Sequence, residues 1–315
     1  MVYRTLSDLC LLVRSNLHKV PHDIDLVVGI PRSGMLPASM IALYLNKRLA
    51  DIDSFVEGRL MSAGERSEYF QDDNIKKVLI VDDSVNRGNA IKNAQAKLKP
   101  IAEKYELIYL APIVTSEGKK FVDVYFEIID DWRVFEWNLM HHEILLSACV
   151  DIDGVLNVDP TFEIDDDGPT YVNFLQNAVP LFLPTAPIDT LISCRLEKYR
   201  SQTEKWLQQH NVEYNNLVML NMPSKQARLH WGRHGEYKAE YFKSRKDLSL
   251  FVESCVDQAR IIAEISQKPV VCIETNSLIL PKPKQDPFLT RIKRLTRKKI
   301  PKVYSVCKNV FGKKW

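Results

Sequence analysis

The sequence has no closely spaced cysteines and no apolar run long enough to cross a membrane. Its six cysteines lie far apart without a CxxC pair, which argues against a cysteine-bound zinc site and favours a reducing compartment. The longest stretch without a formal charge, residues 168–188, contains Gln176, two Asn and four Pro and cannot form a lipid-spanning helix. The first residues also lack an apolar run of signal-peptide length. We therefore expect a cytoplasmic protein.

The composition is that of an ordinary globular protein. The 315 residues are 45% hydrophobic and 26% charged, which excludes the collagen-like, wholly disordered and multi-span membrane classes. A chain of this length is about twice the size of a typical single domain, so the length predicts two compact domains.

Charge is divided unevenly along the chain. Residues 281–315 contain twelve Lys and Arg and one acid, Asp286, whereas the preceding 280 residues contain 31 basic and 39 acidic groups. Solubility does not require a positive segment on a negative body, so the basic segment is predicted to be a functional unit of its own.

In the first half, short β-rich apolar runs alternate with helical stretches, a pattern typical of a parallel sheet covered by helices. The expected elements are strands at 24–30, 78–81, 107–114 and 122–129 and helices at 35–49 and 89–105. The polar segment 57–77 contains two glycines and no sustained period, which predicts a long loop that acts as a lid.

A second cycle of the same kind begins near residue 145. Its expected elements are strands at 188–193, 217–220, 249–253 and 269–274 and helices at 196–210 and 256–267. The predicted fold class is therefore α/β. We expect two doubly wound parallel-sheet domains, at 1–144 and 145–280, followed by a basic amphipathic tail at 281–315.

The apolar strand expected at 78–81 ends in two adjacent acids, Asp82 and Asp83, and leads through a short polar loop into a helix. Backbone N–H groups at a helix N-terminus attract anions, and carboxylates can accept hydrogen bonds from a sugar diol. A phosphorylated pentose satisfies both groups, so the pattern predicts a site for such a sugar.

This motif resembles the phosphoribosyl pyrophosphate (PRPP) signature of type I phosphoribosyltransferases. The resemblance implies that Asp82 and Asp83 face the ribose 2- and 3-hydroxyls while the following loop surrounds the 5-phosphate. The loop residues expected to bind PRPP are Ser84, Val85, Asn86, Arg87, Gly88 and Asn89. Two of them depart from the family's pattern, because Asn89 stands where Thr is usual and Arg87 where a small residue is common.

A second turn, about fifty residues earlier, supports the resemblance. Gly29, Arg32, Ser33 and Gly34 follow the first strand and resemble the family's pyrophosphate loop, in which glycines let backbone amides approach the leaving group. The predicted lid falls between the two motifs, where this family has its flexible loop. Closing it would shield the reaction centre from water.

The end of the first half is the expected place for acceptor recognition. Members of this family have acceptor-contacting residues near this point, so Arg133 and Trp137 are candidates for acceptor contact. Alternatively, both residues pack between the two domains and form a hinge there.

The second half opens with an apolar strand that ends in Asp151, Ile152, Asp153 and Gly154. Two carboxylates one residue apart can divide the work of phosphate hydrolysis, because one can attack phosphorus while the other donates and then removes a proton. The motif closely resembles the first motif of haloacid dehalogenase-like phosphatases. The resemblance implies an Asp151 nucleophile, an Asp153 acid/base and a bound Mg²⁺.

The remaining phosphatase motifs follow in order. Ser193 ends a strand as the hydroxyl of the second motif does, and Lys238 is the expected phosphate-neutralising lysine, with Lys243 as the alternative. The expected metal ligands are Asp151, Asp153 and Glu253. Cys255 stands where Asp is usual, so either metal binding is weakened or this half is inactive.

Apolar residues of the segment 281–315 fall at helical spacing with Lys and Arg between them. This pattern is typical of an interfacial helix attracted to anionic lipid, so we expect peripheral contact with the inner face of the membrane. Contact with nucleic acid, which we consider unlikely, and a disordered solubilising end are the alternatives.

The two resemblances together imply one reaction sequence. A phosphoribosyltransferase leaves a 5-phosphate on its product, which a phosphatase in the same chain can remove, and a ribofuranosyl unit in a glycan must lose it. We therefore expect inverting transfer from PRPP to a hydroxyl of a lipid-linked glycan, then dephosphorylation, as in two-domain proteins of bacterial surface-polysaccharide (O-antigen or capsule) synthesis. The alternatives are a nucleobase phosphoribosyltransferase coupled to a nucleotide 5-phosphatase, and a catalytically silent PRPP sensor.

Overall fold

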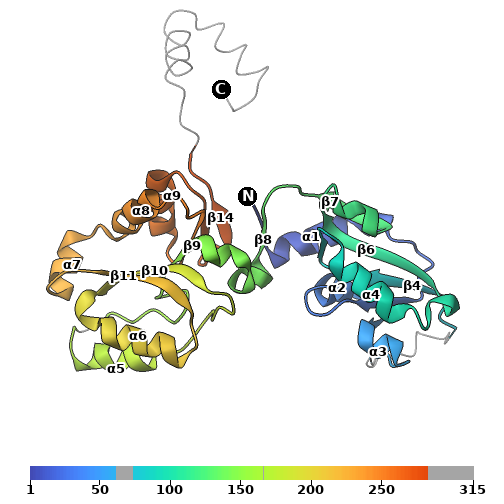
Figure 1. Ribbon diagram of the computed structural model, residues 1–315, viewed down its shortest axis with the longest axis horizontal. Helices are drawn as coiled ribbons and strands as arrows, with labels where there is room; N and C mark the ends of the chain where they lie inside the picture. Colours follow the sequence, from blue (N-terminus) through green and yellow to red (C-terminus); the bar gives the residue numbers. More distant parts are fainter. Residues whose placement is uncertain (62–73, 166, 283–315) are drawn as a thin grey trace, which may run out of the picture.

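The computed structural model describes residues 1–61, 74–165 and 167–282, which form two lobes, each with its own β-sheet (Figure 1). The chain is α/β with two parallel-sheet units, as predicted. Most of the expected lid, residues 62–73 with Arg66, and nearly all of the basic tail, residues 283–315, lie outside the described residues.

The first lobe contains a six-stranded sheet in the order β3-β2-β4-β6-β5, with β7 also paired to β6, and every pairing is parallel. Its strands are β2 (Leu26–Gly29), β3 (Arg48–Asp51), β4 (Lys77–Val81), β5 (Ser84–Val85), β6 (Glu106–Val114) and β7 (Val124–Ile128). Its helices are α1 (Leu6–Asn16), α2 (Met35–Leu45), α3 (Ile52–Val56) and α4 (Asn89–Leu98).

Alternation of side chains along the strands places helices on both faces of this sheet. Leu26 and Ile80 pack in one core cluster with residues of α3 and α4, whereas Val27 and Leu79 pack in another with residues of α1 and α2. All four of these side chains are fully buried. The sheet is therefore doubly wound, which fixes the carboxyl ends of its strands as one open edge.

Two helices of the first lobe end earlier than the sequence predicts. The helix expected at 35–49 stops at Leu45 because Asn46 adopts a left-handed conformation (φ 49°), and the chain then enters β3. The helix expected at 89–105 stops at Leu98, two residues before Pro100, since a proline has no backbone N–H to continue the helical hydrogen bonds. A separate 3₁₀ turn, Ala102–Lys104, follows.

The second lobe contains a sheet in the order β11-β10-β9-β12-β13-β14, parallel except for β14. Its strands are β9 (Ala148–Val150), β10 (Ile188–Leu196), β11 (Tyr214–Leu220), β12 (Leu250–Glu253), β13 (Val270–Cys272) and β14 (Ser277–Ile279). Its helices are α5 (Pro169–Asn177), α6 (Arg200–Gln209), α7 (Lys225–Trp231), α8 (His234–Ser244) and α9 (Val256–Ser266). Residues of α6 pack on one face of the sheet, and residues of α8 and α9 pack on the other.

A short two-stranded parallel ladder lies where the lobes meet, formed by β1 (Val2–Arg4) and β8 (Arg133–Phe135). Tyr3 and Val134 belong to a core cluster of the second lobe, whereas Phe135 packs against Ile113 of the first. The 3₁₀ segments η5 (Glu136–His141) and η6 (Glu143–Ser147) continue from β8 into the second lobe. The boundary at residue 144 remains a prediction, since this linking segment packs on both sides.

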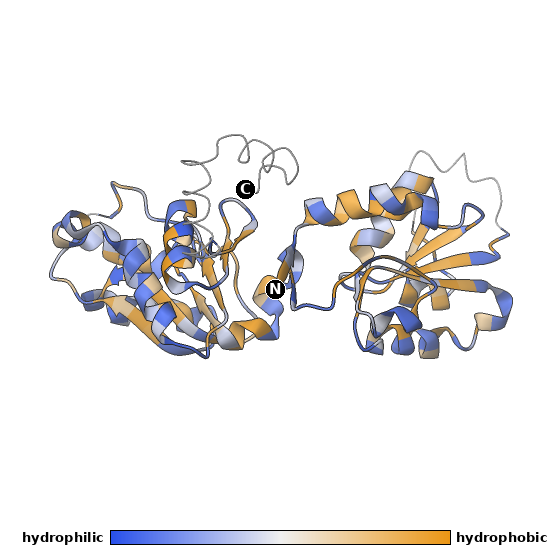
Figure 2. Ribbon diagram, turned by 90° about the horizontal axis from the view of Figure 1, so that it is seen from above, coloured by the Kyte–Doolittle hydropathy of each residue, from blue (hydrophilic) through white to orange (hydrophobic). Residues whose placement is uncertain are grey.

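Hydropathy follows this architecture: the strands are largely apolar, whereas the covering helices contain both apolar and polar residues (Figure 2). None of the helices in residues 1–61, 74–165 and 167–282 has both the length and the apolar character needed to cross a bilayer.

Candidate functional sites at two sheet edges

The two motifs of the first lobe meet at one edge of its sheet. In the pairing of β2 with β4, Gly29 lies opposite Val81, so the turn after each strand starts at the same level. Gly34 closes the first turn tightly, because a Cβ there would lie 2.5 Å from the carbonyl oxygen of Ile30 and 2.7 Å from that of Val81. Only glycine fits this approach, so the turn 29–34 is held against the acid pair.

The acid pair itself is buried, with Asp82 6% and Asp83 5% exposed. The amide of Asp83 donates a hydrogen bond to Oδ1 of Asp82 over 2.9 Å. Burial, together with the neighbouring Asp83, raises the pKa of Asp82 to about 7. Two adjacent carboxylates out of water are therefore available to accept hydrogen bonds from hydroxyl groups.

A cavity of about 420 Å³ opens beside the acid pair. It is lined by Asp82, Ser84, Val85, Asn86, Arg87, Gly88, Asn89, Ala90, Ile91 and Glu143. Gly88 precedes α4 with φ 73°, and a Cβ at this position would lie 2.4 Å from the ring of Phe121. The glycine thus lets the loop turn directly into the helix, whose N-terminal N–H groups and Arg87 favour an anion in this cavity.

The structure brings both acceptor candidates to the acid pair. Trp137 Nε1 donates a hydrogen bond to Oδ2 of Asp83 over 2.8 Å. Arg133 is half-buried, which lowers its pKa, while the negative charge of Asp83 acts in the opposite direction. Nη1 of Arg133 is buried without a hydrogen-bond partner among the described residues. The linking segment therefore forms a wall of this site.

The expected PRPP-binding residues after β4 line the cavity, except Asp83, which lies beside it and is held by Trp137. Those of the earlier turn, Gly29, Arg32, Ser33 and Gly34, lie at the adjoining strand end and do not line it. Glu143 was missed by the sequence analysis, since nothing local in the sequence connects it with a loop more than fifty residues earlier.

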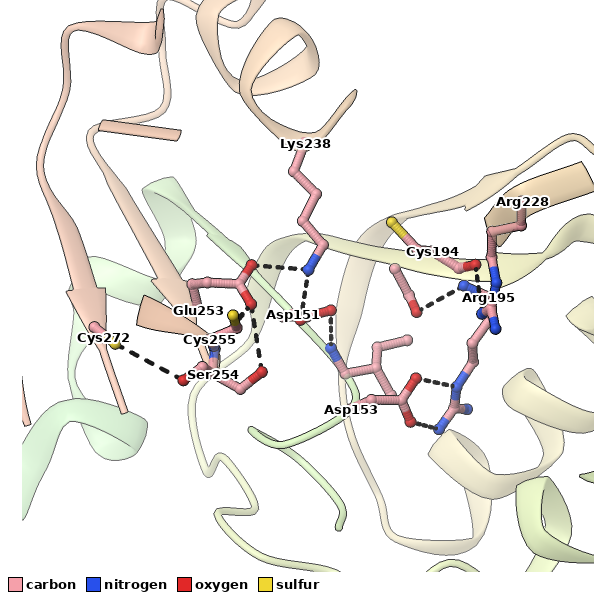
Figure 3. Close-up of polar contacts among 12 residues, drawn as sticks. Asp151, Asp153, Cys194, Arg195, Arg228, Lys238, Glu253, Ser254, Cys255 and Cys272 are labelled. Carbon is pink, nitrogen blue, oxygen red and sulfur yellow. Dashed lines mark hydrogen bonds and ion pairs between the residues drawn. The ribbon is translucent and has the colours of Figure 1, made fainter. Parts of the chain in front are cut away.

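In the second lobe, three charged side chains from different elements meet at the carboxyl end of the sheet (Figure 3). Lys238 of α8 donates from Nζ to Oδ2 of Asp151 over 2.6 Å and to Oε2 of Glu253 over 2.8 Å. Val150 lies opposite Val252, so Asp151 and Glu253 follow paired strands and emerge side by side. All three side chains are nearly or fully buried.

Burial and mutual charge shift the pKa values of this group. Burial and the nearby Glu253 raise the pKa of Asp151, against the effect of Lys238. Burial alone would lower the pKa of Lys238, but the two carboxylates more than offset it and raise that pKa above its usual range. The ammonium group therefore stays charged and counters negative charge at the strand ends.

Asp153 faces a different cation. Arg195 donates from Nε to Oδ2 of Asp153 over 3.0 Å and from Nη2 to Oδ1 over 2.6 Å, and Asn157 donates to Oδ1 over 3.2 Å. Burial would raise the pKa of Asp153, but Arg195 outweighs it and the pKa lies below its usual value. Asp153 is thus held as a carboxylate. The sequence analysis gave Arg195 no role, because its pairing depends on where β10 lies.

The other phosphatase-motif residues fall around this centre. Ser193 is 1% exposed, and its Oγ accepts a hydrogen bond from the amide of Arg195 over 3.1 Å. Lys243 is exposed on α8, so Lys238 is the lysine that reaches the carboxylates. Cys255 contributes its amide, which donates to Oε1 of Glu253 over 3.2 Å.

The donor set does not fit a divalent cation in this arrangement. Each of the six oxygens of Asp151, Asp153 and Glu253 already accepts a hydrogen bond from the protein. Lys238 occupies the point on which Asp151 and Glu253 converge, and Asp153 turns toward Arg195. Across the described ranges, His, Cys, Asp and Glu side chains form no group of three or more able to hold a metal ion.

The first lobe thus defines a class of protein: a parallel-sheet α/β unit with a buried acid pair and a glycine-containing anion loop at the carboxyl edge of its strands. Comparison with known proteins narrows this class. The chain is 33% identical over 133 residues to a xanthine-guanine phosphoribosyltransferase of Chromohalobacter salexigens, a match that covers 40% of this chain and 77% of that protein. The chain therefore belongs to the phosphoribosyltransferase family through its N-terminal part.

Other comparisons are more limited. The chain is 33% identical over 95 residues to the transcriptional regulator GfcR of Methanococcoides burtonii, covering 30% of this chain and 47% of the regulator. A purine phosphoribosyltransferase structure from Pyrococcus horikoshii superposes with a TM-score of 0.33 at 19% identity, covering 43% of this chain and 92% of that one. No family model matches the sequence.

Proposed function

We propose that the first lobe transfers a phosphoribosyl group from PRPP to a sugar hydroxyl of a glycan and that the second lobe then removes the 5-phosphate. The observation that supports this most directly is the pair of acidic centres, each at the carboxyl edge of its own parallel sheet. One adjoins an anion loop, and the other combines Asp151 with Lys238. The first suits a phosphorylated pentose and the second a phosphate ester.

Binding of PRPP follows from the first site. Asp82 and Asp83 would accept hydrogen bonds from the ribose hydroxyls, while Arg87 and the N–H groups at the start of α4 would hold the 5-phosphate. Arg32, exposed on the adjoining turn, would neutralise the pyrophosphate. Magnesium, which phosphoribosyltransferases generally use, would supply further neutralisation of the pyrophosphate when bound.

The transfer is an in-line displacement at the anomeric carbon. A bond forms from the acceptor oxygen to C1, the bond from C1 to pyrophosphate breaks, and pyrophosphate leaves with the electron pair. Attack from the opposite side converts the α-linked donor into a β-linked 5-phosphoribosyl product. Arg133 and Trp137, which border the acid pair, are the proposed acceptor contacts.

Phosphate removal would use the second centre. As Asp151 attacks phosphorus, the bond from phosphorus to the ribose 5-oxygen breaks, and that oxygen leaves with the electron pair and takes a proton from water. Lys238 neutralises the phosphoryl oxygens, and Ser193 adds a hydrogen bond to them. Asp153, held ionised by Arg195, is in the state needed to take a proton from the water that hydrolyses the aspartyl-phosphate. No step is assigned to a metal ion here, because these carboxylates, as the structure places them, form no group of three or more able to hold one.

The coupling can be tested with the full chain, PRPP, magnesium and a panel of lipid-linked and synthetic sugar acceptors, read by mass spectrometry. Wild type should add one ribose, whereas Asp151→Asn should add ribose with one phosphate. Asp257→Asn removes a carboxylate that is 81% exposed and should behave as wild type. A product of Asp151→Asn without the extra phosphate would refute the coupling.

Two further functions each have an observation in their favour. The relative from Chromohalobacter is named as a xanthine-guanine phosphoribosyltransferase, which favours a nucleobase acceptor followed by dephosphorylation to a nucleoside. The second relative is named as a transcriptional regulator, which favours PRPP sensing without turnover. Release of a free nucleoside from xanthine, guanine or hypoxanthine would support the first. Affinity for PRPP without any pyrophosphate release would support the second.

A further inference from the structure

Glu143 lines the cavity beside the acid pair, although it lies far in sequence from the motif at residues 82–89. It begins η6 in the linking segment, is exposed, and lines the same cavity of about 420 Å³ as the loop after β4. Its side chain makes no hydrogen bond or ion pair with the residues that the structure describes. A free carboxylate therefore faces a space that is otherwise built to hold an activated pentose.

The neighbours of Glu143 fix its position. Ile144 and Leu145, which follow it directly, are 2% and 0% exposed and lie in the core of the second lobe. The amide of Ile144 donates to Nδ1 of His142 over 3.0 Å, which closes the turn at this point. Earlier in the linking segment, Trp137 is hydrogen-bonded to Asp83. Glu143 thus stands between two anchored points.

Among the other groups that line the cavity, only Asp82 could accept a proton from an incoming hydroxyl. Ser84, Asn86 and Asn89 carry neutral side chains, and Arg87 is permanently protonated. Asp82 is the second carboxylate in the described lining, but it is 6% exposed and accepts the amide of Asp83. Its place at the strand end suits the ribose hydroxyls, which leaves Glu143 as the carboxylate accessible to an acceptor.

We propose that Glu143 is the general base of the transfer. This inference rests on the proposed function, since it concerns the acceptor of the same donor site. As the acceptor oxygen bonds to C1 and pyrophosphate leaves with its electron pair, the hydroxyl proton moves to a carboxylate oxygen of Glu143 and passes later to water.

The test compares Glu143→Gln with Glu103→Gln in the full chain. Glu103 is also an exposed glutamate on a 3₁₀ turn, so it controls for loss of one surface charge. With PRPP, magnesium and the sugar acceptor that wild type uses, Glu143→Gln should lower kcat by about 100-fold, the usual contribution of a general base. The PRPP affinity of Glu143→Gln, measured by calorimetry, should stay within about twofold of wild type. Glu103→Gln should stay within about twofold of wild type in both kcat and PRPP affinity.

Chemical rescue separates catalysis from a structural role. Sodium formate added to Glu143→Ala should restore transfer, because a small carboxylate can replace the missing one, and should leave Glu103→Ala unchanged. Full activity of Glu143→Gln, or a parallel loss of PRPP affinity without rescue, would overturn the assignment while the proposed transfer stands. Absence of transfer by wild type to every acceptor would instead reject the proposed function, and the inference with it.

Discussion

Trp137 Nε1 donates a hydrogen bond to Oδ2 of Asp83 over 2.8 Å, although the two residues are 54 positions apart in the chain. Trp137 also stacks on Phe135, with ring centroids 4.8 Å apart and planes 3° from parallel. The indole therefore ties the linking segment to the acid pair and orients one carboxylate of the donor site.

Replacing Trp137 by Phe should weaken PRPP binding about fivefold, because the stacking on Phe135 survives while Asp83 loses a buried donor worth about 1 kcal/mol. Isothermal calorimetry with PRPP measures the effect. Trp132→Phe is the matched control, since Trp132 is 58% exposed and takes no part in this bond. Equal affinities in the two variants would show that Trp137 does not orient Asp83.

Asp82→Asn should make the folded protein more stable at pH 8 and weaken its binding of PRPP. The pKa of Asp82 is about 7 in the folded protein and near the ordinary value of 3.8 when unfolded, so folding takes up a proton between these pH values. Stability is therefore lost as pH rises from about 4 to about 7, by up to about 4 kcal/mol at 1.36 kcal/mol per pKa unit.

Urea unfolding at pH 5 and pH 8 measures this effect. Wild type should be less stable at pH 8, and Asp82→Asn should remove much of the difference while losing PRPP binding. Asp257→Asn, an exposed carboxylate substitution, should retain the wild-type difference. A pH dependence that persists in Asp82→Asn would mean that another group is responsible.

Arg195→Met should destabilise the protein by about 3–5 kcal/mol, because it leaves the Asp153 carboxylate buried without its cation. The double variant Arg195→Met with Asp153→Asn should recover part of this loss, since the uncompensated charge is then gone. Chemical denaturation of the four proteins in the cycle gives the coupling energy. Strictly additive losses would contradict a direct pairing.

Gly88→Ala should cost more stability than Gly58→Ala. Both glycines have positive φ, 73° and 75°, so both substitutions introduce similar backbone strain of about 1 kcal/mol. Only at Gly88 would the new Cβ meet a side chain, the ring of Phe121, whereas nothing lies within 4 Å at Gly58. We expect an added loss of about 1–3 kcal/mol and weaker PRPP binding for Gly88→Ala. Equal thermal unfolding of both variants would exclude this contact.

Removing residues 283–315 should abolish attachment to anionic vesicles. The removed segment contains eleven Lys and Arg and one acid, and each basic residue near an anionic surface contributes about 1 kcal/mol of attraction. Flotation with phosphatidylglycerol vesicles should retain the full chain and release the truncated one, with phosphatidylcholine vesicles as the control. Unchanged flotation after truncation would reject this role of the tail.

Local patterns in the sequence were enough to locate most of the first sheet and its motifs. The run at 78–81 became β4, and the acids and small residues after it lie at the strand end as expected. Helix ends were less well predicted, because they depend on single residues such as Asn46 and Pro100. In the second lobe, α7 and α8 were not predicted. Lys238 of α8 lies at the carboxylate centre, and its role with a phosphate stays a prediction.

The sequence by itself determined the α/β class and the order of the acid-bearing motifs, because hydrophobic period and turn residues act over a few neighbouring positions. Only the tertiary structure decided that Arg195 holds Asp153, that Trp137 holds Asp83 and that Glu143 lines the cavity beside the acid pair. Each of these relationships joins elements far apart in the chain. They depend on how sheets and linking segments pack, which no local pattern specifies.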